Sequence, residues 1–185
     1  MAEDRQNLDS EQTGGLTAFT PARPLMLLTN FSPEAQGGGA VILRSLLKPE
    51  DRERIVWVTL SPHEGRGDRG IVSLAPSRDR SLLRDGTIRT GALRERAEKV
   101  MRTRAAPAAW IVAHGAAVRI APSLIATGVP VHITVHDDPA WGNALLTRRY
   151  LALAPFLARD LGHSLRRARS VDVVSEAMRE RYRRL

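Results

Sequence analysis

Short apolar runs alternate with helical patterns along most of the chain, and this alternation constrains the fold more than any other feature. The run LMLLT at residues 25–29 is continuous and apolar, which is typical of a strand buried on both faces. Five further runs predict strands at 55–60, 71–75, 108–114, 131–138 and 171–175. Because helical segments separate most of them, the sequence predicts an α/β fold, a Rossmann-like doubly wound parallel sheet covered by helices on both faces.

The segments between the predicted strands carry helical patterns with recognisable ends. Helices are predicted at 39–47, 91–104, 120–128 and 144–167, with a last helix after Ser175. Lys48-Pro49 should end the first helix, and Gly128 should cap the third. Pro155 should break or kink the fourth. Ser175 stands where an N-cap residue is expected.

Length and composition set the limits of the fold. The 185 residues, 43% of them apolar, suffice for one domain, which we place at 23–185 after a polar, disordered tail at 1–22. The absence of cysteine excludes a disulfide scaffold, a cysteine zinc site and thiol catalysis, and is compatible with the cytoplasm. We find no signal peptide and no stretch approaching the ~20 apolar residues of a membrane span.

The chain is strongly basic, with a formal net charge of +8, and only Lys48 and Lys99 among its 28 basic residues are lysines. One interpretation is a compositional bias with solvated charged faces. The other is attraction to an anionic surface, such as a peripheral contact with membrane lipid. The arginine clusters at 165–169 and 179–185 lack a stacking platform, and no nucleic-acid-binding signature is present. We therefore expect no specific nucleic-acid partner, and keep non-specific binding as a weak alternative.

In a doubly wound sheet, ligands bind outside the carboxyl ends of the strands. The polar and glycine residues at the predicted strand ends therefore rank first as site candidates, and they are Asn30, Gly37, Gly38, Gly39, Ser61, His114, Gly115, His136, Asp137, Asp138, Ser175 and Glu176.

The glycines at 37–39 do not complete either well-known phosphate motif. No lysine follows them, so the P-loop pattern fails. The dinucleotide pattern fails because Ile42 stands at its third glycine and no acid follows the second strand. What remains is a helix N-terminus whose backbone N–H groups can approach an anion. The alternative is a loop that needs positive φ angles and binds nothing.

The histidines offer no metal site. On one strand His132 and His136 would lie roughly 13 Å apart, too far to share an ion. We expect His132 to be a hydrogen-bonded core residue. His136 ends its strand, where it can donate to a sugar hydroxyl or meet a phosphate, with a packing or capping role as the alternative.

Four segments together resemble the N-terminal domain of family-4 glycosyltransferases: FSPEAQGGGA (31–40), AWIVAHG (109–115), PVHITVHD (130–137) and SLRRARSVDVVSEAMRERY (164–182). Their order and spacing agree with the family over roughly residues 24–182. The resemblance implies a GT-B enzyme, in which this domain binds the acceptor and a second Rossmann-like domain binds the nucleotide-diphosphate sugar. That sugar is a co-substrate, so no cofactor is expected.

The resemblance also implies roles for single residues. Gly38 and Gly39, with Gly37, would face the donor diphosphate, and His136 would act at the transferring sugar. Asp137, Ser175 and Glu176 match the motifs with less defined roles in donor binding. Departures occur at Gly162-His163 and at Ser170, where relatives often carry acidic residues.

The printed sequence stops soon after the last of these segments, before any donor-binding domain. We therefore expect an acceptor-binding half of a hexosyltransferase-type enzyme, inactive alone, with a sugar or lipid-linked acceptor and a separately encoded donor domain as partners. Alternatives are a non-catalytic Rossmann-like binding module or a truncated remnant.

Overall fold

The computed structural model describes residues 24–60, 70–74, 88–136 and 154–183. Six strands form one sheet in the order β3-β2-β1-β4-β5-β6, and every pair of neighbours is parallel. The strands are β1 (Leu25–Thr29), β2 (Ile55–Thr59), β3 (Ile71–Ser73), β4 (Ala109–Val112), β5 (Val131–Val135) and β6 (Ser170–Val173). The predicted α/β, doubly wound parallel sheet is confirmed, whereas the predicted tail at 1–22 lies outside the described residues.

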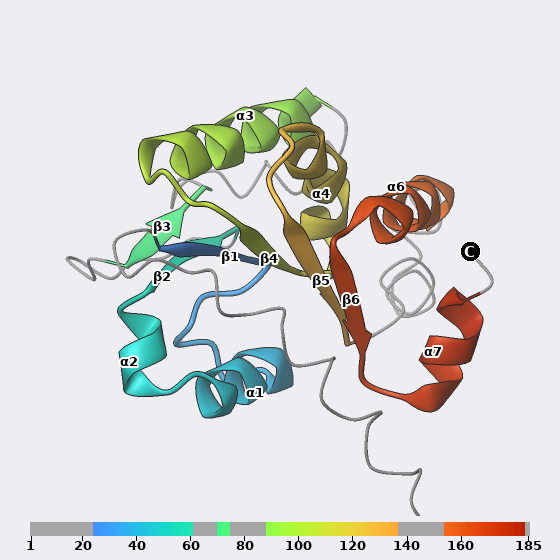
Figure 1. Cartoon of the computed structure of the whole chain (residues 1–185), viewed down its shortest axis with the longest axis horizontal. Coiled ribbons are helices and arrows are strands. Elements are labelled where there is room, and N and C mark those ends of the chain that lie inside the picture. Colours follow the sequence, from blue (N-terminus) through green and yellow to red (C-terminus); the bar gives the residue numbers. More distant parts are fainter. Residues whose placement is uncertain (1–23, 61–69, 75–87, 137–153, 184–185) are drawn as a thin grey trace, which may run out of the picture.

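Helices cover both faces of the sheet (Figure 1). On one side lie α1 (Gly38–Leu46) and α2 (Pro49–Arg52), and on the other α3 (Ile88–Thr103), α4 (Ala116–Ala126) and α6 (Ala154–Arg167). The last helix, α7 (Glu176–Tyr182), follows the edge strand β6, and its Met178 and Tyr182 pack against the same apolar cluster as α6. Crossovers between parallel strands are right-handed, and the chain moves from β1 to β2 in the direction opposite to that from β4 to β5. The helices of the two halves therefore fall on opposite faces.

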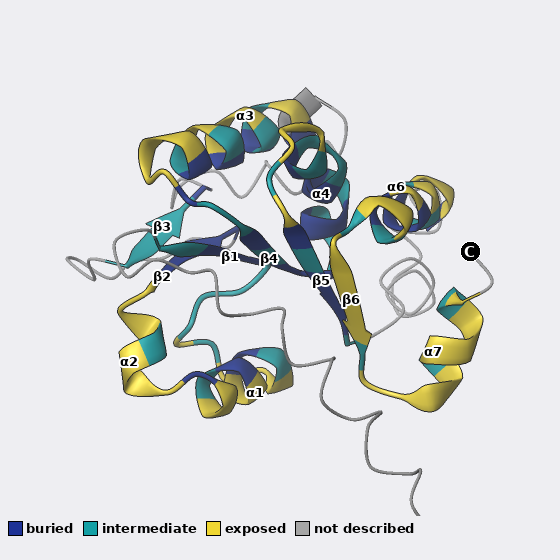
Figure 2. Cartoon of the chain, in the orientation of Figure 1, coloured by how far each residue is buried: buried dark blue, intermediate teal, exposed yellow. Residues whose placement is uncertain are grey.

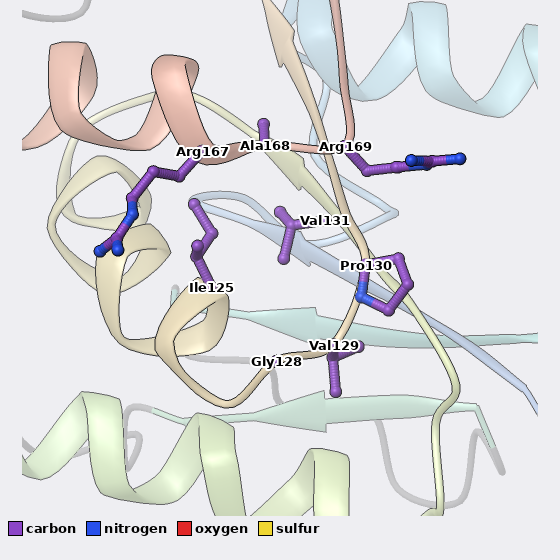
Figure 3. Close-up of a pocket in the computed structure, with 8 residues that line it drawn as sticks. All are labelled: Ile125, Gly128, Val129, Pro130, Val131, Arg167, Ala168 and Arg169. Carbon is purple, nitrogen blue, oxygen red and sulfur yellow. The ribbon is translucent and has the colours of Figure 1, made fainter.

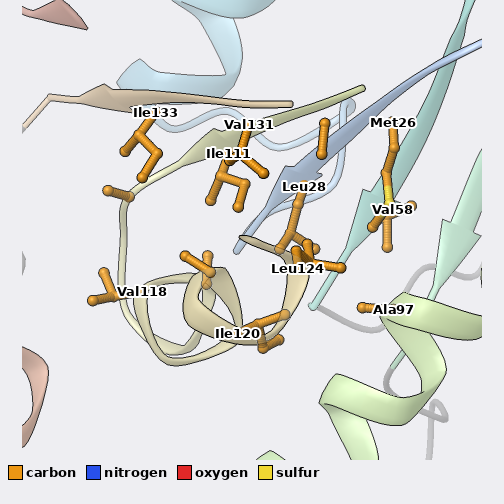
Figure 4. Packing of buried hydrophobic residues seen from close by; sticks show 14 of the residues in the cluster. Met26, Leu28, Val58, Ala97, Ile111, Val118, Ile120, Leu124, Val131 and Ile133 are labelled. Carbon is orange, nitrogen blue, oxygen red and sulfur yellow. The ribbon is translucent and has the colours of Figure 1, made fainter. Parts of the chain in front are cut away.

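Alternating side chains along the strands belong to two separate apolar clusters, one on each face of the sheet. Met26 and Leu28 point to the larger cluster, where Ile120 and Leu124 of α4 pack against the sheet (Figure 4). Leu27, between them, points to the smaller cluster, which contains Leu43 and Leu47 from α1 and the residue after it, with Ile55, Trp57 and Val112. Each such fully buried Leu or Ile side chain contributes about 1.5–3 kcal/mol. The strands are thus anchored from both faces, as their continuous apolar runs predicted.

Helix boundaries differ from the predicted ones where the sequence has no apolar periodicity. α4 begins at Ala116, four residues before its predicted start, because Gly115 turns the chain directly from β4 into the helix. Pro49 ends α1 as predicted, but it also begins the short helix α2. Gly128 has a φ of +81° after α4, which confirms the predicted cap. Pro155 lies in the first turn of α6, where proline is tolerated, and the predicted helix residues before it lie outside the described ranges.

Candidate functional site

The centre of the sheet contains the topological switch point of the fold. β1 and β4 are neighbours, and the chain leaves them toward opposite edges, so the segments after them diverge. Asn30 follows β1, and its Nδ2 atom lies 2.9 Å from the position that a Cβ atom of residue 115 would occupy. Gly115 also has a φ of +51°. Both the contact and the backbone conformation therefore require glycine there.

The segment between β1 and α1 is anchored to the sheet. The Thr29 hydroxyl donates to the Phe31 carbonyl oxygen over 2.5 Å and accepts from Nε1 of Trp57 over 2.8 Å. The Phe31 ring lies edge-on to the Trp57 ring, with 6.5 Å between centroids. Thr29 and Trp57 are both buried, so these contacts fix where the chain leaves the sheet.

Helix α1 holds the same segment from its other side. The guanidinium of Arg44 donates to the carbonyl oxygens of Pro33 and Ala35, the second over 2.8 Å. The Ala35 N–H donates to Ser32 O over 3.1 Å, which closes a turn. A segment that is long for a strand–helix connection is thereby ordered before any ligand arrives.

The three glycines lie at the start of α1. Gly37 is the N-cap residue with a φ of −69°, and the Gly37 carbonyl accepts from the N–H groups of Ala40 and Val41 over 3.0 and 3.1 Å. Within the described residues only Gly115 and Gly128 are glycines with positive φ. Gly37, Gly38 and Gly39 therefore do not have the positive φ angles that the alternative required. The N–H groups of Gly38 and Gly39 precede the helical hydrogen bonds, at the positive end of the helix dipole.

The three positions have different reasons to be glycine. A Cβ atom at Gly39 would lie 3.0 and 3.1 Å from ring carbons of Phe31, so packing explains this glycine. A Cβ atom at Gly37 or Gly38 would meet no atom within 4 Å. Glycine in a helix costs about 0.5–1 kcal/mol relative to alanine. Neither backbone conformation nor available space explains Gly38.

His136 follows β5 at the same edge of the sheet. Its Nε2 atom is buried, and it has no hydrogen-bond partner among the residues that the structure describes. A buried ring nitrogen without a partner is uncommon and is compatible with a ligand atom or water completing the site. Asp137, the next predicted site residue, lies outside the described residues.

A polar cluster that the sequence analysis missed extends from His136 along the face of β5 and β6. Nδ1 of His132 lies 2.8 Å from Oγ of Ser170, and Nε2 lies 3.4 Å from a carboxylate oxygen of Asp172. Nε1 of Trp110 donates to Oγ1 of Thr134 over 2.8 Å. The side chain of His132 is 35% exposed, so its predicted hydrogen bonding is confirmed but its predicted core position is wrong.

The cluster acts on the ionisation of Asp172. Burial alone would raise the pKa of this carboxyl. Hydrogen bonds from His132 and Thr134, and the positive charges of His132 and His136, outweigh burial, so the pKa lies below its ordinary value. His132 and Ser170 are 38 residues apart. The only sequence signal was the polar alternation of His132, Thr134 and His136, which a strand places on one face.

Ser175 and Glu176 have contacts of their own at the next strand end. Oγ of Ser175 accepts from the Met178 N–H over 3.3 Å, which confirms the predicted N-cap of α7. Glu176 pairs with Arg179 over 3.3 Å. Their predicted role toward the donor stays a prediction.

The sheet order separates the candidates into near and distant ones. Neighbouring strands lie about 4.8 Å apart, so His136 follows a strand roughly 10 Å from β1, and Ser175 follows one roughly 14 Å away. Asn30 and Gly115 meet at the switch point, and the three glycines lie at the end of the segment that leaves β1 there. His136 follows a strand closer to the switch point than the strand before Ser175, and the Ser175 segment is the most distant.

A pocket of about 460 Å³ lies at the opposite edge of the sheet, before β5 and β6 (Figure 3). It is lined mostly by apolar residues at the end of α4, including Ile125 and Val129. The side chains of Arg167 and Arg169 lie on two sides of the pocket and point away from each other, so they cannot both bind one anion (Figure 3). It is not the site that the strand-end rule indicates.

In the described parts of the chain, no group of three or more His, Cys, Asp or Glu side chains is placed to hold a metal ion. None of the helices within these ranges combines the length and apolar character that crossing a membrane requires. Comparison with the models of known protein families, with curated proteins and with solved structures gives no match. The family resemblance of the sequence thus stays a prediction.

Proposed function

We propose that this domain is the acceptor-binding half of a glycosyltransferase that moves a sugar from a nucleotide-diphosphate sugar to an acceptor. The observation that carries the proposal is the start of α1, which the chain reaches after leaving β1, and where Gly38 is glycine without a conformational or steric reason of its own. The N–H groups of Gly38 and Gly39 lie at a helix N-terminus that the Thr29 and Arg44 contacts hold in place. Such a terminus suits the diphosphate of a donor.

The chemistry of sugar transfer fits this arrangement. As the bond between sugar and phosphate breaks, negative charge grows on the departing diphosphate, and fixed N–H dipoles stabilise it without reorganising. His136 would contribute the hydrogen-bonding capacity of Nε2 at the sugar or its phosphate. The nucleotide itself would bind to a second domain, in line with the family that the sequence resembles.

The proposed setting is the cytoplasm, with a sugar or lipid-linked acceptor at the membrane face. The absence of cysteine is compatible with a reducing compartment. A lipid-linked acceptor would place the protein at a membrane surface, and the excess of arginine would favour this location because basic side chains are attracted to anionic lipids.

The test is a titration of the ¹⁵N-labelled chain with inorganic pyrophosphate at constant ionic strength, followed by amide chemical shifts. We expect shifts at Gly38 and Gly39, and weaker binding to Gly38→Ala, because the added methyl group obstructs approach to the helix terminus. Gly91→Ala is the matched control, since Gly91 is also an exposed helical glycine with open space around it, in α3. Equal binding by the two variants, or shifts confined to arginine-rich segments, would refute the proposed site.

A further inference from the structure

The outward face of α6 gathers positive charge around one exposed aromatic ring. Its exposed residues are Pro155, Phe156, Arg159, His163, Arg166 and Arg167. At 3.6 residues per turn they fall within an arc of about 120°. The opposite arc is buried toward the sheet and α4, and it includes Leu157 and Leu161 (Figure 2). We call the exposed arc the α6 basic face.

No exposed acidic side chain neutralises this face within α6. Its one acid, Asp160, is turned toward α4, where it pairs with Arg119 over 3.4 Å. Arg167 lies 3.4 Å from His163, which is neutral or positive but never negative. Arg159 and Arg167 of the α6 basic face are exposed and therefore present their charge to solvent.

Helix α7, which is also rich in arginine, differs from α6. Arg179 pairs with Glu176 over 3.3 Å, and Arg183, the C-cap residue of α7, pairs with Glu180 over 2.9 Å. Two arginines, one in α7 and one at its C-cap, are thus paired with nearby carboxylates. The two helices are both rich in arginine, but the exposed arginines of the α6 basic face lack the acidic partners within their own helix that Arg179 and Arg183 have.

Phe156 gives the α6 basic face a second chemical character. Its side chain is 55% exposed, and it is the one large apolar residue exposed on α6. An interfacial helix combines an aromatic ring that enters the headgroup layer with guanidinium groups that meet lipid phosphates. A single-stranded nucleic acid would call for several aromatic rings along the path, and α6 offers only this one. We propose that the α6 basic face docks the protein on a membrane surface rich in anionic lipid.

Co-sedimentation with vesicles tests the charge requirement. The protein should bind vesicles of phosphatidylcholine mixed with phosphatidylglycerol, and not pure phosphatidylcholine. Removing both charges in Arg159→Gln/Arg167→Gln should weaken binding about thirtyfold, since each basic residue near such a surface contributes roughly a factor of five. The matched control Arg179→Gln/Arg183→Gln removes the same number of positive charges at α7. It should change binding less than threefold, because these two arginines are paired with Glu176 and Glu180 and do not belong to the α6 basic face. Equal losses in both variants would overturn the proposal.

An environment-sensitive fluorophore tests the position of Phe156. Because the chain has no cysteine, Phe156→Cys and Leu46→Cys each accept one label. Leu46 is 63% exposed on α1, across the sheet from α6, and serves as the control. We expect a blue shift on anionic vesicles only from position 156. A shift at 46 alone, or binding of mixed-sequence DNA in place of vesicles with the same dependence on Arg159 and Arg167, would overturn the proposal.

The α6 basic face does not depend on the proposed transferase function. It lies on the helix between β5 and β6, whereas the switch point lies between β1 and β4. Loss of vesicle binding and loss of pyrophosphate binding are therefore separate outcomes.

Discussion

Alanine substitutions at the adjacent helical glycines Gly38 and Gly39 should change the free energy of unfolding in opposite directions. A Cβ atom at Gly38 has open space around it, so Gly38→Ala gains the lower conformational entropy of unfolded alanine without a clash. The expected gain is about 0.5–1 kcal/mol. Unlike a clash, this gain requires no rearrangement of the folded state.

The cost at Gly39 follows from its contact with Phe31. A Cβ atom there would lie 3.0 Å from Cε1 and 3.1 Å from Cζ of the ring, inside the ~3.5–4.0 Å optimum for carbon pairs. The ring cannot move freely, because it packs edge-on against the buried Trp57. Overpacking costs about 1–3 kcal/mol, which exceeds the helix gain and leaves a net loss of about 0.5–2 kcal/mol for Gly39→Ala.

Urea unfolding followed by tryptophan fluorescence measures both variants, with unchanged m-values as the criterion for comparing them. In a Phe31→Ala background the clash disappears, so Gly39→Ala should then stabilise by about the same 0.5–1 kcal/mol as Gly38→Ala. A destabilised Gly38→Ala variant would show that Gly38 has a structural role. A loss at Gly39 that persists without the Phe31 ring would refute the steric explanation.

The remaining predictions concern the anchor of the β1–α1 segment and the polar cluster. Thr29→Val leaves Nε1 of the buried Trp57 without its acceptor and should cost about 1–3 kcal/mol in urea unfolding, whereas Thr29→Ser, which keeps the hydroxyl, should cost less. Asp172 has a lowered pKa in the folded state, so its ionised form contributes stability above its unfolded pKa, and this contribution is lost as the pH falls through the folded pKa. The stability difference between wild type and Asp172→Asn should accordingly be present near neutral pH and shrink as the pH falls below the ordinary pKa of an aspartate, and a difference that stays constant on acidification would contradict it.

The sheet could be predicted because its strands are buried on both faces. Runs such as LMLLT need no partner information, since their apolar continuity already excludes an exposed strand or a surface helix. The start of α4 could not be predicted in the same way. Ala116 and Ala117 fit many structures, and only the positive φ of Gly115 beside Asn30 fixes the helix start.

Only those parts of the candidate site that directly follow a strand could be predicted from the sequence. Gly37 to Gly39 and His136 were expected near one another because they follow strands of a doubly wound sheet. The contacts of His132 with Ser170 and Asp172 depend on the register of β5 with β6, in which His132 faces Ser170. Register is set by packing between segments far apart in sequence, so no local sequence pattern could predict which residue of β6 lies beside His132.

The glycines at the strand ends show why a glycine-rich sequence is ambiguous until the surroundings are known. Gly115 is required by its positive φ angle and by the nearby Asn30 side chain, and Gly39 is required by its contact with the Phe31 ring. Once these are explained, Gly38 remains without a conformational or steric cause, at the first turn of the helix that the chain reaches after leaving β1. The proposed function would account for Gly38 by an anion that approaches the helix N-terminus from outside.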